Sequence, residues 1–189
     1  MTTELTRCSW AAKKSIFHQY HDLEWGTPVH NDQTHFEFIV LESAQAGLSW
    51  ETIMKRRDDY RKAFAHFSPT RVAQMTIVDV DRLMASSNII RNRGKIEATI
   101  ANAAFFLAIQ KEFGSFDRYI WNFVNNKTIV YSPKSVEEYH TRNAASDALS
   151  KDMRARGFKF IGSTIMYAHL QACGLIQEHE VTCFRYTNQ

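Results

Sequence analysis

The sequence has little of what would mark a specialised class of protein. Only seven Gly, three Pro and three Cys occur among 189 residues, which excludes collagen-like, Pro-rich disordered and disulfide-dense secreted chains. No uncharged apolar run approaches the roughly 18 residues of a membrane helix, and Met1–Arg7 is charged where a signal peptide is apolar. We therefore expect a cytoplasmic protein with no membrane partner, folded as a single domain over residues 1–189.

The sequence also lacks a strong net charge. Lys and Arg number 23 against 20 Asp and Glu, a formal charge of +3, which is too small for a chain that binds nucleic acid by charge alone. Cations gather in three stretches, Lys55–Arg57, Arg91–Lys95 and Lys151–Lys159. Each stretch taken alone is typical of a solvated helix face, so the charge leaves the partner open.

Period-2 alternation, the pattern of a half-buried strand, is almost absent, and helical spacing dominates. Between Thr34 and Ala65 apolar residues recur at three- and four-residue steps, which predicts two helices that meet near Gly47. The same spacing predicts helices over 78–87 and 95–111, and an irregular connection with short helices over 116–143. Two more helices are expected, one from Ser146 as N-cap to Arg156, closed by Gly157, and one over 163–173 closed by Gly174. The predicted fold class is all-α.

Cys and His residues stand near both ends of the chain, as Cys8 and His21 at one end and His179 and Cys183 at the other. A helical turn would place His179 and Cys183 on one face, and Cys with His is a ligand set of structural Zn²⁺. In the entropic model of cross-links, such a link between distant segments stabilises a fold by at most about 4–5 kcal/mol. Buried thiols with surface histidines are the alternative, because the spacing from Cys8 to His21 is not that of a compact finger. Cys173 lies in an apolar segment and is expected in the core.

Glu42 lies in an apolar segment, Phe38–Ala44. A buried carboxylate costs several kcal/mol unless it is paired, hydrogen-bonded or protonated, and such a residue is often retained for a function. Aromatic residues are frequent nearby in the sequence, at Trp10, Phe17, Tyr20, Trp25 and Trp50. Aromatic faces with one carboxylate suit a flat, cationic ring. The alternatives are a Glu that reaches solvent at the helix edge and aromatics that fill the core.

The segment Arg154–Thr164 joins the last two predicted helices. Gly157 and Gly162 permit a tight hairpin, and the free N–H groups at the start of the second helix can hold a phosphate. Neighbouring cations such as Lys159 would add attraction to a nucleic-acid backbone. The pattern fits a helix-hairpin-helix element, with an ordinary helical turn as the alternative.

These features occur together in one known family. From Cys8 to about Tyr186 the sequence closely resembles the 3-methyladenine DNA glycosylase I family, the constitutive bacterial enzymes of the helix-hairpin-helix superfamily. The segments that carry the resemblance are Tyr20–Asp22, Glu24–Gly26, Leu41–Glu42, Gln45–Trp50, Ile89–Arg91, Arg93–Ile96, Ala145–Lys151, Arg156–Phe160 and Gln171–Leu175.

The resemblance implies an all-α helix-hairpin-helix glycosylase fold, with the hairpin near 146–174 and with segments 8–21 and 179–183 joined by structural Zn²⁺. It implies base-excision repair of alkylated double-stranded DNA, in which 3-methyladenine, and weakly 3-methylguanine, is flipped out and released by hydrolysis. The implied site residues are Glu42 as the catalytic, base-contacting residue; Trp10, Phe17, Tyr20, Trp25 and Trp50 in the base pocket; Gly47 and Leu48 as the DNA wedge; Gly157, Lys159, Gly162, Ser163 and Thr164 on the DNA backbone; and Cys8, His21, His179 and Cys183 on the metal.

Three features depart from the family or superfamily pattern. Phe17 stands where a relative carries Tyr, so any contact by a hydroxyl group is lost there. Ser163 and Thr164 follow the second hairpin glycine where lyase-type members carry Lys, which favours simple hydrolysis. Glu178 falls in a region where many superfamily members have a catalytic Asp, but the sequence does not decide its role, and Glu42 ranks above it.

Two other functions fit parts of the sequence. A non-catalytic, zinc-stabilised helical DNA-binding protein would keep the hairpin and place Glu42 and its aromatics in the core. A small-molecule hydrolase would keep the aromatic pocket without needing the hairpin. We expect a monomer, with no protein partner implied by the sequence.

Overall fold

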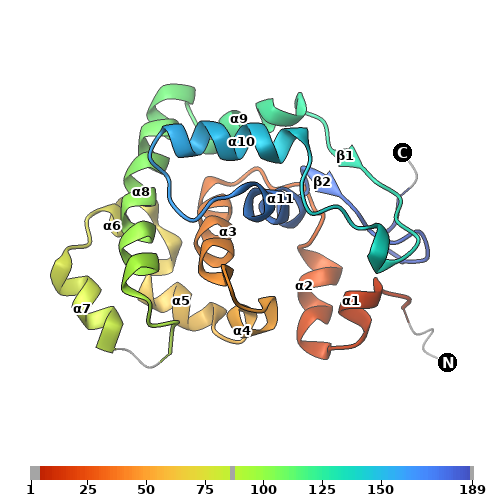
Figure 1. Ribbon diagram of the computed structural model, residues 1–189, viewed down its shortest axis with the longest axis horizontal. Coiled ribbons are helices and arrows are strands. Elements are labelled where there is room, and N and C mark those ends of the chain that lie inside the picture. The colour runs from red at the N-terminus through yellow and green to blue at the C-terminus, as the bar shows by residue number, and fades with distance from the viewer. Residues whose placement is uncertain (1–4, 86–87, 188–189) are drawn as a thin grey trace.

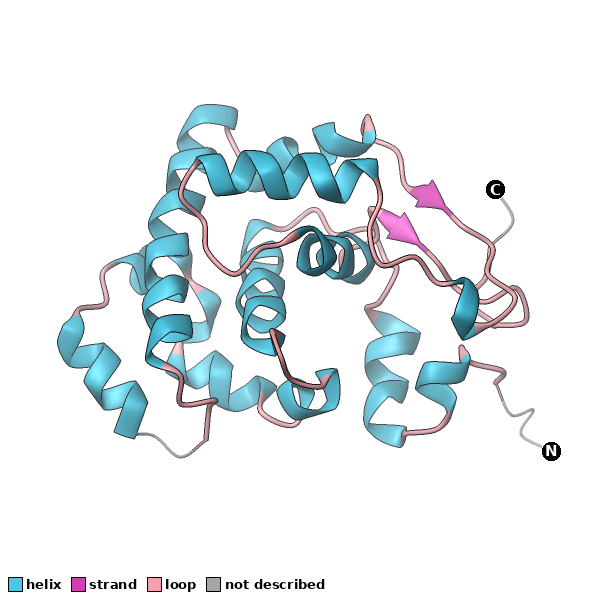
Figure 2. Ribbon diagram, in the orientation of Figure 1, coloured by secondary structure: helices cyan, strands magenta, loops and turns pink. Residues whose placement is uncertain are grey.

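Helices make up most of the computed structural model, which describes residues 5–85 and 88–187 (Figures 1 and 2). The first half contains α1 (Ser9–Ala12), the 3-10 helix η1 (Ser15–Phe17), α2 (His18–Leu23), α3 (Asp32–Gln45), α4 (Trp50–Met54), α5 (Arg57–Ala63), η2 (Ala65–Phe67), α6 (Pro69–Ala73) and α7 (Ile77–Ala85). The second half contains α8 (Arg93–Phe113), α9 (Phe116–Trp121), η3 (Asn122–Val124), β1 (Ile129–Val130), η4 (Val136–Glu138), α10 (Ala144–Ala155), α11 (Ser163–Ala172) and β2 (Ile176–Gln177).

Helices α3 and α11 form the centre of the molecule, with α8 beside α3 and α10 packed against α11 (Figure 1). Helix α3 begins where the Asn31 side chain accepts a hydrogen bond from the Thr34 N–H. From Phe36 to Ala44 every residue of α3 is buried except Glu37. A helix that is apolar around most of its circumference can only lie inside the fold, so α3 carries Glu42 into the interior.

The region predicted as two helices near Gly47 is three helices. The chain leaves α3 at Ala46, and a new helix begins at Trp50 because the Ser49 hydroxyl accepts from the Thr52 N–H at 3.2 Å. The turn between α4 and α5 has no Gly or Pro to mark it, which is why spacing alone missed it. The predicted helices over 78–87 and 95–111 correspond to α7 and α8, although the predicted end at Ser87 lies outside the described residues.

The predicted N-cap of α10 was wrong. The cap is Asn143, whose side chain accepts from the Ser146 N–H, while the Ser146 hydroxyl accepts from the Asn143 N–H at 2.9 Å. Ser146 is therefore the third helical residue of a capping box. Both residue types favour caps, so composition could not decide between them. The last helix, α11, begins at Ser163 as expected and ends at Ala172.

One pair of short strands was also missed. Strands β1 and β2 lie parallel, with Ile129 opposite Ile176. Two residues are too few to produce an alternating pattern, so the otherwise helical prediction omits them. The pair brings the segment after α11 beside the middle of the chain, and the Phe184 N–H donates to the Thr6 carbonyl at 2.8 Å. No helix of the described ranges is both long and apolar enough to cross a lipid bilayer.

Candidate active site

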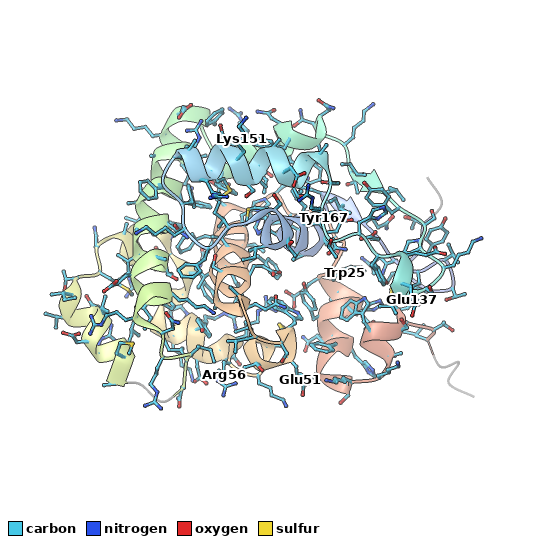
Figure 3. All side chains as sticks on the ribbon, viewed as in Figure 1. Trp25, Glu51, Arg56, Glu137, Lys151 and Tyr167 are labelled. Carbon is cyan, nitrogen blue, oxygen red and sulfur yellow. The ribbon has the colours of Figure 1, made fainter. Side chains whose placement is uncertain are left out.

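A cavity of about 290 Å³ opens between α2, α3, α11 and the segment that follows η4. Figure 3 shows Trp25 just after α2 and Tyr167 on α11, near the centre of the molecule. The residues that line the cavity are Trp10, Tyr20, Trp25, Glu42, Gln45, Trp50, Val136, Tyr139, His140, Ala168 and Gln171. The structure thus brings together Glu42 and the aromatic residues singled out in the sequence, with the exception of Phe17.

Glu42 is the only acidic residue that the described part of the chain contributes to the lining of this cavity. Its side chain is 3% exposed, and no described residue forms a hydrogen bond or ion pair with it. Burial raises the pKa of its carboxyl group to about 8, because the charged form is deprived of water. A ligand that brings a positive charge or a hydrogen-bond donor would reverse this effect and favour the carboxylate.

The aromatic side chains form a continuous wall. Trp10 lies edge-on to Trp25, with ring centroids 5.1 Å apart, and Tyr20 lies 5.6 Å from Trp50. The indole N–H of Trp50 is buried and has no hydrogen-bond partner among the described residues. Phe17 is buried behind the wall, where it packs edge-on against Trp10 at 5.8 Å. Phe17 therefore supports a wall residue instead of lining the cavity itself.

A second buried carboxylate, Glu178, lies behind the cavity wall. Its Oε1 accepts from the His140 N–H at 3.1 Å and from His140 Nδ1 at 2.6 Å. Its Oε2 accepts from the Tyr167 hydroxyl at 2.8 Å and from Gln171 Nε2 at 2.6 Å. Glu178 does not line the cavity, but two of its partners, His140 and Gln171, do.

Several lining residues received no role from the sequence. Gln45 and Gln171 stand inside segments that resemble the family, which was the available signal. Tyr139 and His140 come from the irregular connection, where spacing carries no information about what a side chain faces. Only the tertiary fold brings that connection against α11 and β2.

The loop after α3 projects beside the cavity. Gly47 has φ +78°, a left-handed conformation that favours glycine, and the Leu48 side chain is 38% exposed. From α8, the ammonium group of Lys95 donates to the carbonyls of Ala44 at 2.8 Å and Ala46 at 2.6 Å. These bonds satisfy carbonyls at the end of α3 and anchor the start of the loop. A smaller hollow beneath the loop is lined by Glu42, Gln45, Ala46, Gly47, Leu48, Thr164, Ile165 and Ala168.

The connection from α10 to α11 is a tight turn held from within. Gly157 has φ +105°, and a Cβ there would lie 2.5 Å from the Phe105 ring. Asn102 bonds both the N–H and the carbonyl of Lys159, at 2.9 and 3.0 Å. At Gly162 no side chain caps α11, and a Cβ would meet nothing within 4 Å. The first N–H groups of α11 are therefore open to an anion.

The two chain ends bring Cys8, His21, His179 and Cys183 together, all buried. Cys8 Sγ lies 3.4 Å from His179 Nδ1, and Cys183 Sγ lies 3.4 Å from His21 Nε2 and 3.7 Å from His179 Nδ1. The other nitrogen of His21 contacts Asp22 at 2.8 Å, the support that metal-binding imidazoles commonly have. The 179–183 segment is a turn and not the helical turn assumed from the spacing, with the Cys183 N–H bonded to the Glu180 carbonyl at 2.8 Å.

The chemistry of this cluster fits a metal of the zinc type. The Cys8 thiol donates toward Cys183, so the pKa of the Cys183 thiol lies far below its usual value and that of Cys8 lies above. The N–H groups of Glu180 and Arg185 also donate to the two sulfurs, each at 3.4 Å. Two thiolates and two imidazoles are a ligand set of structural Zn²⁺, and a dication bound there would replace the shared proton.

Comparison with known proteins agrees with the geometry. The methyladenine glycosylase family profile matches residues 10–186. The DNA-3-methyladenine glycosylase 1 of Escherichia coli (strain K12) is 44% identical over 182 residues, which cover 96% of this chain and 97% of that protein. A crystal structure of 3-methyladenine DNA glycosylase I covers 96% of this chain and 100% of its own, with 43% identity and a TM-score of 0.93.

A further solved structure concerns the basis of 3-methyladenine recognition by the Staphylococcus aureus enzyme. It is 36% identical, has a TM-score of 0.93 and covers 98% of both chains. Sequence and fold therefore agree over nearly the whole length, and this chain belongs to the methyladenine glycosylase family.

Proposed function

We propose that this chain is a DNA-3-methyladenine glycosylase, which removes the damaged base from alkylated DNA by hydrolysing its N-glycosidic bond. The observation that carries the proposal is an aromatic cavity whose lining contains Glu42, a buried carboxylate without a partner among the described residues. The non-catalytic alternative would make Glu42 and its aromatics core residues. That alternative predicts a filled core around Glu42 and not an open cavity.

The chemistry suits a cationic base. Methylation at N3 gives the adenine a positive charge, so the base leaves as a neutral molecule and needs little acid catalysis. Trp and Tyr faces attract such a ring by stacking and by cation–π attraction. As the cation enters, it lowers the pKa of Glu42 and favours the carboxylate. Glu42 then accepts hydrogen bonds from the base, and it either stabilises the oxocarbenium-like sugar or orients the attacking water.

The DNA-binding elements lie beside the cavity. Flipping a base out of the stack costs a few kcal/mol, and we assign Leu48, with Gly47, to filling the gap that the base leaves. The α10–α11 connection acts as the helix-hairpin-helix element, in which Gly157 and Gly162 shape the turn. The N–H groups of Ser163 and Thr164 hold a phosphate, and Lys159 adds positive charge. With Ser163 and Thr164 in place of a lyase lysine, the reaction is hydrolysis without strand cleavage.

Cys8, His21, His179 and Cys183 would hold a structural Zn²⁺. The ion would supply no chemistry to the reaction, and its contribution would be a link between the first and last segments of the chain. Elemental analysis of the purified protein should find a single zinc ion per chain. A Cys183→Ala variant should retain none, and zinc-free wild-type protein of full stability would contradict this assignment.

Release of free bases from methylated DNA, identified by chromatography, tests the function. The wild type should release 3-methyladenine, and Glu42→Gln should slow single-turnover release by about 10²–10³-fold. Glu51→Gln is the matched control, because Glu51 of α4 is ion-paired with Lys55, just after the helix, at 2.7 Å and does not line the cavity. A wild type that retards methylated DNA in a gel but releases no base would be a binding protein, and turnover of free nucleosides would indicate a small-molecule hydrolase.

A further inference from the structure

A second cluster of Cys and His side chains lies between the two central helices. His35 comes from α3, and His169 and Cys173 come from the end of α11; all three are fully buried. One potential ligand atom of each lies within 4.8 Å of the other two. Cys173 Sγ is 3.8 Å from His169 Nε2, close to the 3.4–3.7 Å that separate sulfur and nitrogen in the cluster at the chain ends. None of the three residues lines the cavity that holds Glu42.

Packing alone does not account for this cluster. His169 and Cys173 are four residues apart, so the helix places them on one face, and the ring of His35 lies 5.6 Å from that of His169. The Nδ1 atoms of His35 and His169 are both buried and have no hydrogen-bond partner among the described residues. A buried polar atom left without a partner costs about 1–3 kcal/mol, so two neighbouring ones in a core point to a ligand that they would bind.

The surroundings of His35 leave one of its nitrogens free to bind a metal. Nε2 faces two acceptors, the Val29 carbonyl at 3.2 Å and Asp117 Oδ1 at 3.7 Å, so Nε2 carries the proton and Nδ1 keeps a lone pair. An imidazole that donates one N–H to a backbone carbonyl is the usual state of a metal-binding histidine. Burial lowers the pKa of His35 to about 4 and that of His169 well below its usual value. Both rings are therefore neutral near pH 7, as metal ligands must be.

The donor set and its burial select the ion. Two imidazoles and one sulfur suit copper or zinc. Zinc with three protein ligands takes water as its fourth, but here the three side chains are closed to solvent, and the described part of the chain adds no fourth ligand to the group. Cu⁺ prefers sulfur and is stable with three ligands.

We propose that His35, His169 and Cys173 form a copper(I) site that links α3 to α11. As Cu⁺ binds, the S–H bond of Cys173 breaks, the Cu–S bond forms and the proton passes to solvent, with no change in oxidation state. The site is distinct from the cluster at the chain ends and does not depend on the proposed function. Because α3 carries Glu42 and α11 carries Gln171, the ion would tie together two helices that form the cavity.

The test is a titration of the wild type, first supplied with one equivalent of Zn²⁺, with Cu⁺ buffered by bicinchoninate in the absence of oxygen. Elemental analysis after desalting should find one copper ion per chain beside the zinc. The affinity for Cu⁺ should fall more than about 100-fold in His35→Leu and in Cys173→Ala, because the loss of a ligand exceeds the effect of losing its support. His30→Gln is the matched control and should bind copper as the wild type does, because His30 also contacts Asp117, at 3.0 Å, but lies outside the cluster.

X-ray absorption at the copper edge of the wild type gives a readout that needs no variant to fold. The proposal predicts one sulfur and two nitrogen ligands, whereas copper at the chain ends would show two sulfurs from Cys8 and Cys183. Loss of zinc during the titration, with equal copper uptake by wild type and His35→Leu, would overturn the proposal, and so would a wild type that takes up no copper. A second zinc ion in the wild type that is missing from His35→Leu would overturn the assignment of copper.

Discussion

Glu42 and Glu178 are both buried carboxylates beside the same cavity, and their surroundings are opposite. Glu42 lines the cavity and has no hydrogen-bond or ion-pair partner among the described residues, whereas the oxygens of Glu178 are occupied by donors from His140, Tyr167 and Gln171. Burial alone therefore does not identify a reactive group. A carboxylate left without partners is available to a ligand, and one saturated by protein donors orders its neighbours.

The difference predicts opposite effects on stability when each carboxylate is altered. The largest effect should come from Glu178→Ala, because four hydrogen-bond donors around a fully buried carboxyl group lose their acceptor at once. The free energy of unfolding should fall by about 3–5 kcal/mol, the range for removing one partner of a buried charged network. Urea denaturation at neutral pH measures this change in the free energy of unfolding. A decrease of less than about 1 kcal/mol would mean that water replaces the carboxylate as acceptor. The contrast between Glu178 and Glu42 would then be smaller than the geometry indicates.

Glu42→Gln should have the opposite sign at neutral pH. The carboxyl of Glu42 has a pKa of about 8 in the folded protein against 4.5 for the free side chain, so the folded state binds its proton more tightly than the unfolded state does. Wild-type stability therefore falls as the pH rises from about 4.5 to 8, by at most about 3 kcal/mol at pH 7.

Unfolding of Glu42→Gln and wild type across this pH range measures that penalty. The two proteins should have similar free energies of unfolding near pH 4. As the pH rises toward 8, the free energy of unfolding of the variant should exceed that of the wild type by a growing margin. Parallel curves for the two proteins would show that the Glu42 carboxyl group is solvated in the folded state, and the comparison with Glu178 would lose its basis.

The smallest of these effects is expected for Lys95→Met, which bears on the end of the helix that carries Glu42. The variant removes two hydrogen bonds to the carbonyls of Ala44 and Ala46 and should lower stability by about 2 kcal/mol. Because the Gly47–Leu48 loop is then no longer anchored to α8, release of 3-methyladenine from DNA should slow. Binding of free 3-methyladenine, followed by tryptophan fluorescence, should be unchanged. Weaker binding of the free base would show that Lys95 acts on the cavity and not on the loop.

Most of the fold was predictable because helices leave a regular signal. The spacing of apolar residues located α3, α7 and α8, and the helix predicted to close at Gly174 corresponds to α11. The predicted Cys8, His21, His179 and Cys183 do meet in the structure. The errors have local causes. Asn143 and Ser146 are both good caps, the break between α4 and α5 has no Gly or Pro, and strands of two residues have no period.

The candidate site was predictable in part, for a different reason. Trp10, Tyr20, Trp25 and Trp50 stand near Glu42 in the sequence, and the fold keeps them together around the cavity. The partners of Glu178 could not be found this way, because His140 lies in an irregular segment 38 residues away. Its position against Glu178 depends on β1, β2 and the packing of the connection, none of which the local sequence encodes.

The cavity takes its walls from both ends of the chain, with Trp10 on one side and Gln171 on the other, and the segment that follows closes onto Cys8. During synthesis the aromatic residues near the N-terminus are made before α11. The cavity is therefore incomplete until α11 has been synthesised. A nascent chain that stops short of α11 has the aromatic faces but no site. The base-sized site therefore exists only after α11 has been made and has packed against α3.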